Sequence, residues 1–574
     1  MKIEFANHFC NKKNVRRIKI FIIVLFISII PIGMFAQINA PGSVSSFDYS
    51  NLSWTDAFDS LHACLSLRYP FTDLKAVDWP EKKTVAEILI NKDQINNDTI
   101  SFISHLFEYL YQIPDGHIEL VGNIDSFKQS MIAGTYGFNM IPVDDGSVVV
   151  SLLPEESPAY DAGLRTGDKI QTWNGINIDS VGSREYLNYF RNYATAGGRM
   201  FSRYLMLSRD SINATAEISF ISNKTKAIST INLTAFDDSM QMYMMGLFNT
   251  AQPPNMDSLV YYETLENNVG YLYIGAEASQ GMTPEEIMQS PDFIMVQEAI
   301  SYFNENNIDK LIVDLRFNLG GNDLQAAVMM GLFYENSSFY ENITSTCDND
   351  YEVVYSLFTE PLTPKYNGEI AVIVDPNCIS TGEGLAMMFQ RLNNAQIVSH
   401  WGTNASFGIV DFEPVLLPEG LAVTFPQARS LDENLNIQLD SDSSMIGGVQ
   451  PDIHVPLDIQ SVIQQYELGV DVQLNYAKSL LLGIDKNIVA DDCILFPNPC
   501  VDKINIKLLN NTSDGIYNLR IYNLQGQLVS SDNLLFATEN EIKTLNLRTL
   551  KSGVYSYSLS NGSYNHKGKF IIRP

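Results

Sequence analysis

The chain has 574 residues and a formal net charge of −29, with 45% hydrophobic, 11% aromatic and 18% charged residues. At about 100–200 residues per domain, the length predicts three or four domains, and this apolar content excludes an intrinsically disordered chain. So acidic a protein repels nucleic-acid phosphates and anionic membranes, which makes both poor partners.

Residues 1–36 predict a secretory signal peptide. Basic residues between Lys12 and Lys19 precede an apolar run over residues 20–35, and Ala36 is a small residue suited to a cleavage site. The alternative is an uncleaved membrane anchor, but the run is shorter than the ~20 residues of a spanning helix and contains Pro31. We therefore expect no stable membrane span after cleavage.

The six cysteines are scattered and show no Cys-x-x-Cys or Cys/His spacing, so no metal site is expected. Cys493 and Cys500 are close enough in sequence to pair in an oxidising compartment, if their geometry allows it. Most of the others are expected to be buried as small hydrophobic residues.

Residues 37–130 are expected to form a helical N-terminal domain. Apolar residues recur at helical spacing over residues 53–67 and 100–113. The second run ends at Pro114-Asp115-Gly116-His117, a sequence typical of turns.

Residues 131–235 predict a small β domain. A β-branched strand over residues 147–151 precedes a short helix capped at Ser157, then a second strand and a hairpin turn at Asn174-Gly175. The run Ser-Pro-Ala-x-x-Ala-Gly-Leu-Arg-x-Gly-Asp-x-Ile, followed by Asn-Gly, resembles a bacterial-type PDZ domain.

PDZ domains bind the ends of extended peptides by adding a strand to a sheet edge. The resemblance implies that a loop would hold a terminal carboxylate through its backbone amides. This loop consists of Tyr136, Gly137, Phe138 and Asn139. The alternative is a domain that only packs against its neighbour and binds nothing.

Residues 255–460 alternate between strand and helix patterns, which predicts a layered α/β core. Strand patterns cover residues 269–274, 310–316, 370–375 and 395–398, and helical patterns cover residues 285–304 and 381–392.

Residues 314–322 read Asp-Leu-Arg-Phe-Asn-Leu-Gly-Gly-Asn at the end of a predicted buried strand. A glycine pair there lets the backbone approach a ligand closely and offers free N–H donors. The Gly-Lys-[Ser/Thr] of a nucleotide-binding loop is absent, so nucleotide binding is disfavoured and no cofactor is expected.

Ser380 lies between a predicted strand and a predicted helix. This position presents its hydroxyl and the following amide to a cleft, where the helix N-terminus favours a developing negative charge. The alternative is an ordinary N-cap serine, with Glu383 completing a capping box.

The two segments together, Asp-x-Arg-x-Asn-x-Gly-Gly and Val-Asp-x-x-x-x-Ser-x-x-Glu, resemble peptidase family S41, and residues 449–455 match the closing motif of that family. The resemblance implies a ClpP/crotonase-like core and peptide or protein substrates. It also implies that Ser380 is the nucleophile and that Gly320, Gly321 and Thr381 are the oxyanion donors.

A serine hydroxyl needs a base to attack a carbonyl. Some S41 members use a lysine that follows the serine, at a place where this chain has Ala405. Tricorn-like members instead use a histidine ahead of the PDZ domain, and His117 matches that place. His400 is the alternative base, and His105 within a predicted helix is expected to be structural.

The chain departs from the tricorn-like pattern at Met445, where a glutamate of the charge relay is expected. Substitutes remain open among Asp440, Asp442, Ser443 and Ser444. Glu383 is expected to hold the start of its helix rather than to orient the base. The alternative function is therefore a catalytically weakened peptide- or ligand-binding protein of the same fold.

Residues 461–490 form a mixed polar segment that we expect to link domains, and residues 491–574 predict a small β-sandwich. The tail contains Phe-Pro-Asn-Pro, Ile-Tyr-Asn-x-x-Gly-Gln-x-Val and Leu-x-x-Gly-Val-Tyr. These motifs resemble the C-terminal sorting domain of proteins exported by the type IX system of Bacteroidetes. The alternative is an adhesive or carbohydrate-binding module.

The predicted fold class is multidomain α+β, with a helical N-terminal region, a PDZ-like β domain, an α/β core and a C-terminal β-sandwich. The predicted function is a secreted serine endopeptidase with a histidine base and PDZ-assisted peptide recognition. The sorting resemblance implies the type IX secretion machinery as a partner. It also implies a location outside a Gram-negative cell or on its surface, reached through the periplasm.

Overall fold

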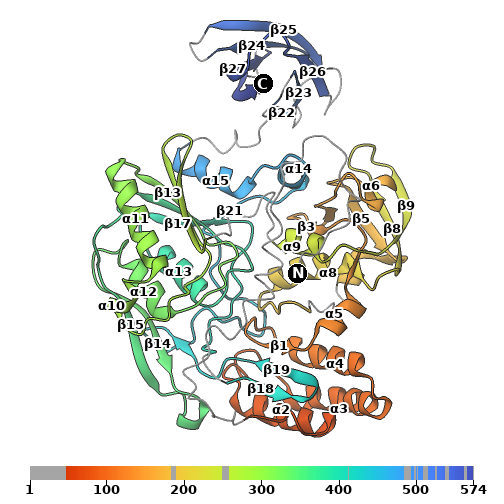
Figure 1. Ribbon diagram of the computed structural model, residues 1–574, viewed down its shortest axis with the longest axis vertical. Helices are drawn as coiled ribbons and strands as arrows, with labels where there is room; N and C mark the ends of the chain where they lie inside the picture. Colours follow the sequence, from red (N-terminus) through yellow and green to blue (C-terminus); the bar gives the residue numbers. More distant parts are fainter. Residues whose placement is uncertain are drawn as a thin grey trace, which may run out of the picture.

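A computed structural model describes the protein (Figure 1). The described residues are 47–182, 189–247, 258–410, 413–483, 493–496, 500, 502–508, 515–523, 527–536, 542–561 and 565–572. The predicted signal peptide, residues 1–36, lies outside them. None of the helices in this part of the chain is long and apolar enough to span a membrane.

The N-terminal region contains four helices in its described residues and receives a hairpin from the catalytic region. Its main helices are α2 (Trp54–Arg68), α3 (Trp79–Asn96) and α4 (Thr99–Tyr111), followed by α5 (Asp125–Met131). Ser53, Asp78 and Asp98 cap the N-termini of the three main helices by accepting backbone N–H bonds. The apolar faces of the helices pack against a sheet of order β1-β19-β18 (Figure 1). Its strands are β1 (Glu119–Gly122), β18 (Val415–Leu417) and β19 (Leu421–Thr424).

The second domain is built on an antiparallel sheet of order β3-β4-β5-β8-β9, with β6 paired to β5. Its strands are β3 (Met140–Pro142), β4 (Val148–Val150), β5 (Lys169–Trp173), β6 (Ile176–Asn177), β8 (Thr215–Ile221) and β9 (Ile228–Thr234). A smaller sheet joins β2 (Gly134–Thr135), β7 (Arg209–Asp210) and β10 (Phe236–Asp237). The helices are α6 (Pro158–Asp161), α7 (Ile178–Gly182), α8 (Ala196–Leu207) and α9 (Gln241–Leu247).

The central domain is a six-stranded sheet of order β11-β12-β13-β16-β17-β21, parallel from β12 onwards. Its strands are β11 (Val260–Leu265), β12 (Val269–Ile274), β13 (Lys310–Asp314), β16 (Glu369–Ile373), β17 (Ala395–Ser399) and β21 (Ile453–His454). The helices α10 (Pro284–Ile287), α11 (Pro291–Glu305), α12 (Asp323–Met330) and α13 (Thr381–Gln390) bury the largest apolar cluster against one face. Because helices cover the parallel strands, the middle residues of these strands are apolar, which explains why the sequence pattern predicts them. A separate antiparallel sheet joins β14 (Ser338–Thr344), β15 (Val353–Thr359) and β20 (Ser430–Leu431).

Most of the segment expected as a linker, residues 461–490, is folded onto the central domain. It contains most of α14 (Ile459–Tyr466) and all of α15 (Val472–Leu481). Val472, Ala477 and Leu481 of α15 enter an apolar cluster on the second face of the sheet. This segment is polar overall because only one side of each helix is buried, and therefore it resembles a linker in composition.

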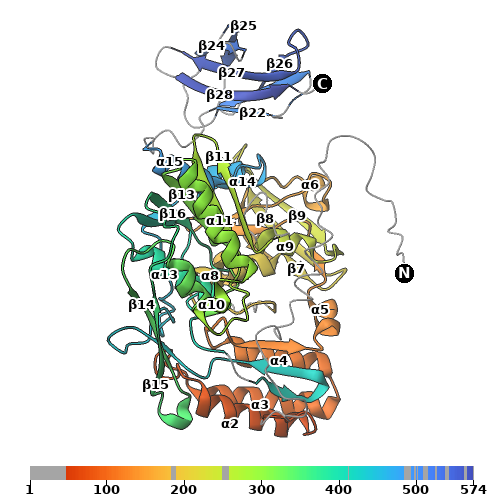
Figure 2. The ribbon, with the colours of Figure 1, turned by 60° about the vertical axis from the view of Figure 1, so that its left-hand side comes forward.

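The C-terminal domain consists of two antiparallel sheets that share an apolar core (Figure 2). One sheet holds β22 (Cys493–Phe496), β23 (Lys503–Leu508) and β26 (Ile542–Asn546). The other holds β24 (Gly515–Tyr522), β25 (Leu528–Phe536), β27 (Gly553–Ser560) and β28 (Asn565–Ile572). The core cluster draws all its members from residues 495–572, so this domain has a core of its own. The side chain of Cys493 is outside the described residues, so its pairing with Cys500 stays a prediction.

Candidate active site

Ser380 occupies a strained turn between β16 and α13. Its φ and ψ are 59° and −134°, a conformation that residues with a Cβ rarely adopt and that clusters at functional sites. Its N–H donates to the carbonyl of Ser406 at 3.1 Å. The Ser380 hydroxyl makes no capping hydrogen bond, so the ordinary N-cap alternative does not describe this residue.

The glycine loop packs directly against Ser380. Gly320 has a φ of 78°, and a Cβ placed on it would lie 2.6 Å from the Ser380 Cβ and 3.0 Å from the Thr381 nitrogen. Gly321 has a φ of 154°, and its Cβ would collide with the carbonyl of Glu277. Both positions therefore require glycine, and the loop backbone faces the start of α13.

Three amides are the predicted oxyanion donors, and their hydrogen bonds differ. The N–H of Gly320 donates to Asn318 Oδ1 at 2.8 Å. Thr381 opens α13, where the first N–H groups have no partner within the helix. Among the hydrogen bonds of the described residues, none uses the N–H of Gly321 or Thr381. Thr381 Oγ1 donates to the carbonyl of Gly321 at 2.8 Å and thereby joins the two segments.

The turn that holds His117 meets the turn that holds Ser380. Gly116 donates its N–H to Ser406 Oγ at 2.7 Å, and Ser406 also accepts the N–H of Ser380. A Cβ on Gly116 would lie 2.6 Å from Ile379 Cδ1. The turns that hold His117 and Ser380, which are far apart in the sequence, thus meet through one shared residue, Ser406.

Side chains from the N-terminal domain fix the His117 turn. Asp115 is fully buried, and its carboxylate accepts the N–H of His117 at 2.9 Å and the Tyr69 hydroxyl at 2.7 Å. Lys75 donates to the carbonyl of Pro114 at 2.9 Å and to Ser441 Oγ at 2.8 Å. The turn is therefore held from two domains at once.

The His117 ring itself is half-buried, and its Nδ1 atom has no hydrogen-bond partner among the described residues. Burial lowers the pKa of His117 to about 4, and Asp115 opposes the shift only in part. A neutral ring can accept a proton, as a general base must.

Glu383 does not close a capping box; its carboxylate instead organises the loop after β17. It accepts hydrogen bonds from Thr403 Oγ1 at 2.5 Å, from the Ala405 N–H at 2.7 Å and from the Ser406 N–H at 2.8 Å. Burial raises the pKa of Glu383 to about 7, against the lowering effect of these donors. Ser406 is bonded to the backbone N–H groups of both Ser380 and Gly116. Glu383, which accepts the N–H of Ser406, therefore helps to hold both turns in position.

Among the possible substitutes for the missing glutamate, Asp440 is the buried carboxylate. Its Oδ1 accepts the N–H of Phe407 at 3.3 Å, and its Oδ2 has no hydrogen-bond partner among the described residues. Burial raises its pKa. Asp442 instead accepts backbone N–H groups of its own exposed turn, which contains Met445.

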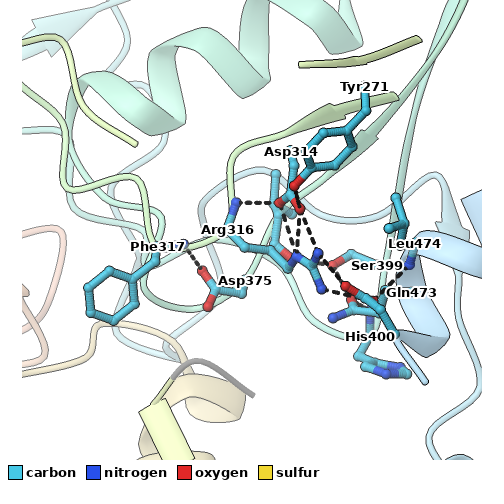
Figure 3. Close-up of polar contacts among 11 residues, drawn as sticks. Tyr271, Asp314, Arg316, Phe317, Asp375, Ser399, His400, Gln473 and Leu474 are labelled. Carbon is cyan, nitrogen blue, oxygen red and sulfur yellow. Dashed lines mark hydrogen bonds and ion pairs between the residues drawn. The ribbon is translucent and has the colours of Figure 1, made fainter. Parts of the chain in front are cut away.

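A buried ion-pair cluster anchors the strand that leads into the glycine loop (Figure 3). Arg316 Nη2 lies 2.5 Å from Asp314 Oδ2 and 2.8 Å from Asp471 Oδ2. Asp471 is the N-cap of α15, and Asp314 also accepts the Tyr271 hydroxyl at 2.9 Å. The cluster ties the glycine loop to a helix beyond the closing motif of the family.

Phe317, the next residue, is held from the other side. It has a φ of 60°, and its N–H donates to Asp375 Oδ1 at 2.9 Å (Figure 3). Asp375 also accepts the N–H groups of Asn377 and Cys378, just ahead of Ser380. One carboxylate therefore sets the positions of both loops.

The two other candidate histidines have structural contacts. The backbone N–H of His400 donates to Gln473 Oε1 at 2.9 Å (Figure 3), and its Nδ1 lies 2.8 Å from the carbonyl of Val455. His105 Nδ1 lies 2.5 Å from Asp93 Oδ2 in the N-terminal domain.

The predicted carboxylate-binding loop of the β domain is buried, and much of its hydrogen bonding is internal. The N–H groups of Tyr136, Gly137 and Asn139 donate to Ser208 O, Thr135 Oγ1 and Leu152 O. Phe138 is fully buried, and the Asn139 side chain donates to a carbonyl of α9 at 2.6 Å. Asn139 is the residue of this loop that contacts α9, and the three bonded amides would have to exchange partners to hold a peptide terminus.

The β domain also contacts the turn ahead of Ser380. Asn377 accepts the Tyr193 hydroxyl at 2.7 Å and donates to the carbonyl of Leu247, the last residue of α9, at 3.0 Å. The arrangement of α9 and that of the nucleophile turn are therefore physically linked.

Sequence reasoning did not identify several residues that shape the site. They are Tyr69, Lys75, Glu277, Ser406 and Asp471. Their common signal is a polar side chain that becomes buried only when distant segments meet, which local patterns do not reveal. Among the described residues, no group of three or more His, Cys, Asp or Glu side chains could hold a metal ion.

Residues 288–455 match the family described as peptidase family S41, and residues 494–573 match the secretion system C-terminal sorting domain. Mature CPAF complexed with lactacystin is 12% identical to this chain with a TM-score of 0.54, over 76% of this chain and 99% of CPAF. Mature CPAF is 13% identical with a TM-score of 0.53, over 76% and 98% of the two chains. The photosystem II D1 C-terminal processing protease is 15% identical with a TM-score of 0.35, over 73% and 98%. No curated protein matches the chain.

The chain thus contains a serine-type peptidase domain of family S41, a class of hydrolases that act on peptides or proteins. It is a secreted peptidase: its type IX C-terminal sorting domain directs it to the cell surface or outside the cell in Bacteroidetes. The CPAF structures share its fold.

Proposed function

We propose that this protein is an extracellular serine endopeptidase with Ser380 as its nucleophile and His117 as its base. The observation that carries the proposal is the strained Ser380 backbone, held against the glycine loop on one side and, through Ser406, against the His117 turn on the other. An N-cap role alone would not require this conformation.

In the acylation step, Ser380 Oγ attacks the carbonyl carbon of the scissile bond while His117 takes the hydroxyl proton. The carbonyl oxygen becomes an oxyanion, stabilised by the N–H groups of Gly321 and Thr381 and by the N-terminus of α13. His117 then gives its proton to the leaving amine, the C–N bond breaks, and an ester remains on Ser380.

In the deacylation step, His117 removes a proton from a water molecule that attacks the ester, and it returns that proton to Ser380 Oγ as the ester breaks. Gly320 joins the oxyanion donors only when its N–H leaves Asn318 Oδ1. We expect this exchange when the substrate carbonyl offers a stronger, negatively charged acceptor.

A second candidate function is peptide binding without cleavage. It is favoured by the unpartnered Nδ1 of His117 and by Met445 at the expected glutamate position. A relay without an orienting group leaves the base free to adopt the wrong tautomer, which weakens catalysis.

Fluorophosphonate labelling separates the two functions, because the probe reacts only with an activated serine. We expect Ser380 to be labelled in the wild type and peptide hydrolysis to fall at least about 10³-fold in Ser380→Ala. Circular dichroism should show an unchanged fold, since only a hydroxyl is removed. Hydrolysis near the wild-type rate in Ser380→Ala would exclude this nucleophile.

For the β domain we propose a supporting role in peptide recognition that depends on α9. Because Asn139 at the end of the loop is bonded to α9 and packed against Gly246, the domain binds a peptide terminus in a conformation in which α9 shifts and the loop amides exchange partners. The alternative is the packing role alone. Isothermal titration of a peptide with a free C-terminus, against the same peptide with an amidated end, tests the two.

A further inference from the structure

Glu277 lies directly behind the glycine loop, in the segment that follows β12. Its side chain is buried, and its Oε1 accepts a hydrogen bond from Asn318 Nδ2 at 2.9 Å. Its N–H donates to the carbonyl of Gly320 at 3.1 Å, and its carbonyl accepts the N–H of Asn322 at 2.9 Å. The backbone and the side chain of Glu277 therefore both hold the loop that faces Ser380.

Asn318 is bonded both to the glycine loop and to the turn that contains Ser380. Its Nδ2 also donates to the carbonyl of Ile274 at 3.0 Å, which orients the amide so that Oδ1 accepts the N–H of Gly320. Its own carbonyl accepts the N–H of Ile379 at 3.0 Å, next to Ser380. The Glu277 carboxyl is thus two hydrogen bonds away from a predicted oxyanion donor.

The surroundings of Glu277 favour a neutral carboxyl. Its Oε2 is buried and has no hydrogen-bond partner among the described residues. The ionisable groups that face it are Asp323 of α12, Asp292 of α11, Tyr340 of β14 and Cys378. Burial raises the pKa of Glu277 to about 8, and the hydrogen bond from Asn318 only partly opposes this. A negative charge at this place would be both desolvated and repelled.

We propose that Glu277 is a positioning residue of the peptidase site, which holds the glycine loop through Asn318 as a neutral carboxylic acid. This inference rests on the proposed function, since the loop matters for catalysis only if Ser380 is the nucleophile. In the neutral form, Oε1 accepts from Asn318 without an unpaired charge. Loss of the proton leaves a desolvated charge that Asp323 and Asp292 repel, so the segment around Glu277 must rearrange to admit water and the glycine loop shifts with it.

The test compares wild type with Glu277→Gln, which keeps the shape and the acceptor but cannot ionise. We expect the variant to keep its kcat at pH 7 within about twofold, because glutamine mimics the neutral acid. The wild type should lose kcat above about pH 8, where Glu277 ionises, with a smaller change in KM. Glu277→Gln should keep its kcat across that range. A purely structural role would not move the alkaline limb.

Thermal unfolding gives a second readout that needs no activity. A carboxyl whose pKa is raised on folding binds its proton more tightly in the folded chain, so it stabilises less as the pH rises from its unfolded pKa towards about 8. The Tm of Glu277→Gln relative to wild type should therefore increase between pH 5 and pH 8.

Glu341→Gln is the matched control. Glu341 is a second buried carboxyl with a raised pKa, and it accepts a hydrogen bond from Ser430 Oγ at 2.5 Å rather than from the glycine loop. Its substitution should change the dependence of Tm on pH but leave the alkaline limb of kcat in place. An alkaline limb that persists unchanged in Glu277→Gln overturns the inference while the proposed function stands. Absence of hydrolysis in the wild type overturns the proposed function, and the positioning role with it.

Discussion

At the scale of single residues, the site depends on polar groups that are buried without complete hydrogen bonding. His117 Nδ1, Glu277 Oε2 and Asp440 Oδ2 are all buried and have no partner among the described residues. Such atoms are rare in folded proteins, because each costs about 1–3 kcal/mol of desolvation. Of these atoms, His117 Nδ1 belongs to the proposed base, whose ring therefore has no orienting partner at that nitrogen among the described residues.

The base assignment predicts a ranking of two histidine variants. His117→Ala should lower kcat/KM about as much as Ser380→Ala, at least about 10³-fold, because residues that act as a unit fail together. His400→Ala should cost much less activity, since its Nδ1 is engaged with the carbonyl of Val455. Steady-state hydrolysis of one peptide by both variants gives the ranking, and the reverse order would move the base to His400.

The same assignment predicts the acid side of the pH profile. The pKa of His117 is lowered to about 4 by burial, so the ring is neutral and able to accept a proton above that pH. The ascending limb of kcat/KM should therefore lie near pH 4, well below the ordinary histidine value of about 6.5. A limb at the ordinary value would mean that the working base is a more exposed group.

The residue scale also shows how much of the site the sequence predicts. Ser380, Gly320, Gly321 and Thr381 lie in two local motifs, so the residue types and their spacing are enough to indicate them. Lys75 and Asp471 carry no such local signal, because each becomes buried only by meeting a partner far along the chain.

At the scale of elements, the central strands and helices could be predicted because parallel strands covered by helices are continuous apolar runs. The hairpin β18–β19 could not be assigned to the N-terminal domain, because its partner β1 is about 300 residues away and short strands carry little register information. The helices α14 and α15 were missed because half of each faces solvent. The fold thus extends the catalytic unit beyond the closing motif.

The ion-pair cluster predicts that α15 is required for activity. A chain ending at residue 455 loses Asp471 and leaves Arg316 with only Asp314, and it also exposes the apolar face under α15. Breaking a buried ion pair costs roughly 3–5 kcal/mol of folding stability when no partner remains. Since Arg316 keeps Asp314 in Asp471→Asn, we expect this variant to lose less stability than that, and to lose part of its activity. Urea unfolding and peptide hydrolysis measure both effects.

A chain ending at residue 483 is the matched control, because it keeps α14 and α15 and lacks only the C-terminal domain. It should hydrolyse peptides like the full chain, whereas the chain ending at residue 455 should be inactive. Full activity in the shorter chain would mean that α15 does not support the glycine loop.

At the scale of the whole molecule, the peptidase region and the sorting domain have separate apolar cores. The apolar core of the C-terminal domain contains only residues 495–572, and Figures 1 and 2 show its sheets beyond the α15 end of the catalytic region. A domain with its own core can fold and be recognised without the peptidase. This separation is what we expect of a sorting domain that the export machinery recognises and that is cleaved off afterwards.

The location of the removal site follows from the same arrangement. Proteases cut exposed stretches in preference to packed helices. The segment expected as a linker is packed onto the catalytic sheet as far as α15, and β22 begins at Cys493. We therefore propose that a sorting enzyme cuts between residues 484 and 492, since a cut inside α14 would separate Asp471 from Arg316 and a cut inside α15 would break a helix packed on the catalytic sheet.

Mass spectrometry of the extracellular protein tests this directly. The mature form should end between residues 484 and 492 and should keep peptides that cover α15, whereas peptides from residues 549–574 should be absent. A chain that lacks residues 491–574 should stay in the periplasm, because it carries no address for the second export step. Recovery of the intact tail in the released form would show that the sorting domain stays attached after export, and a mature end inside α15 would show that this helix is not part of the working peptidase.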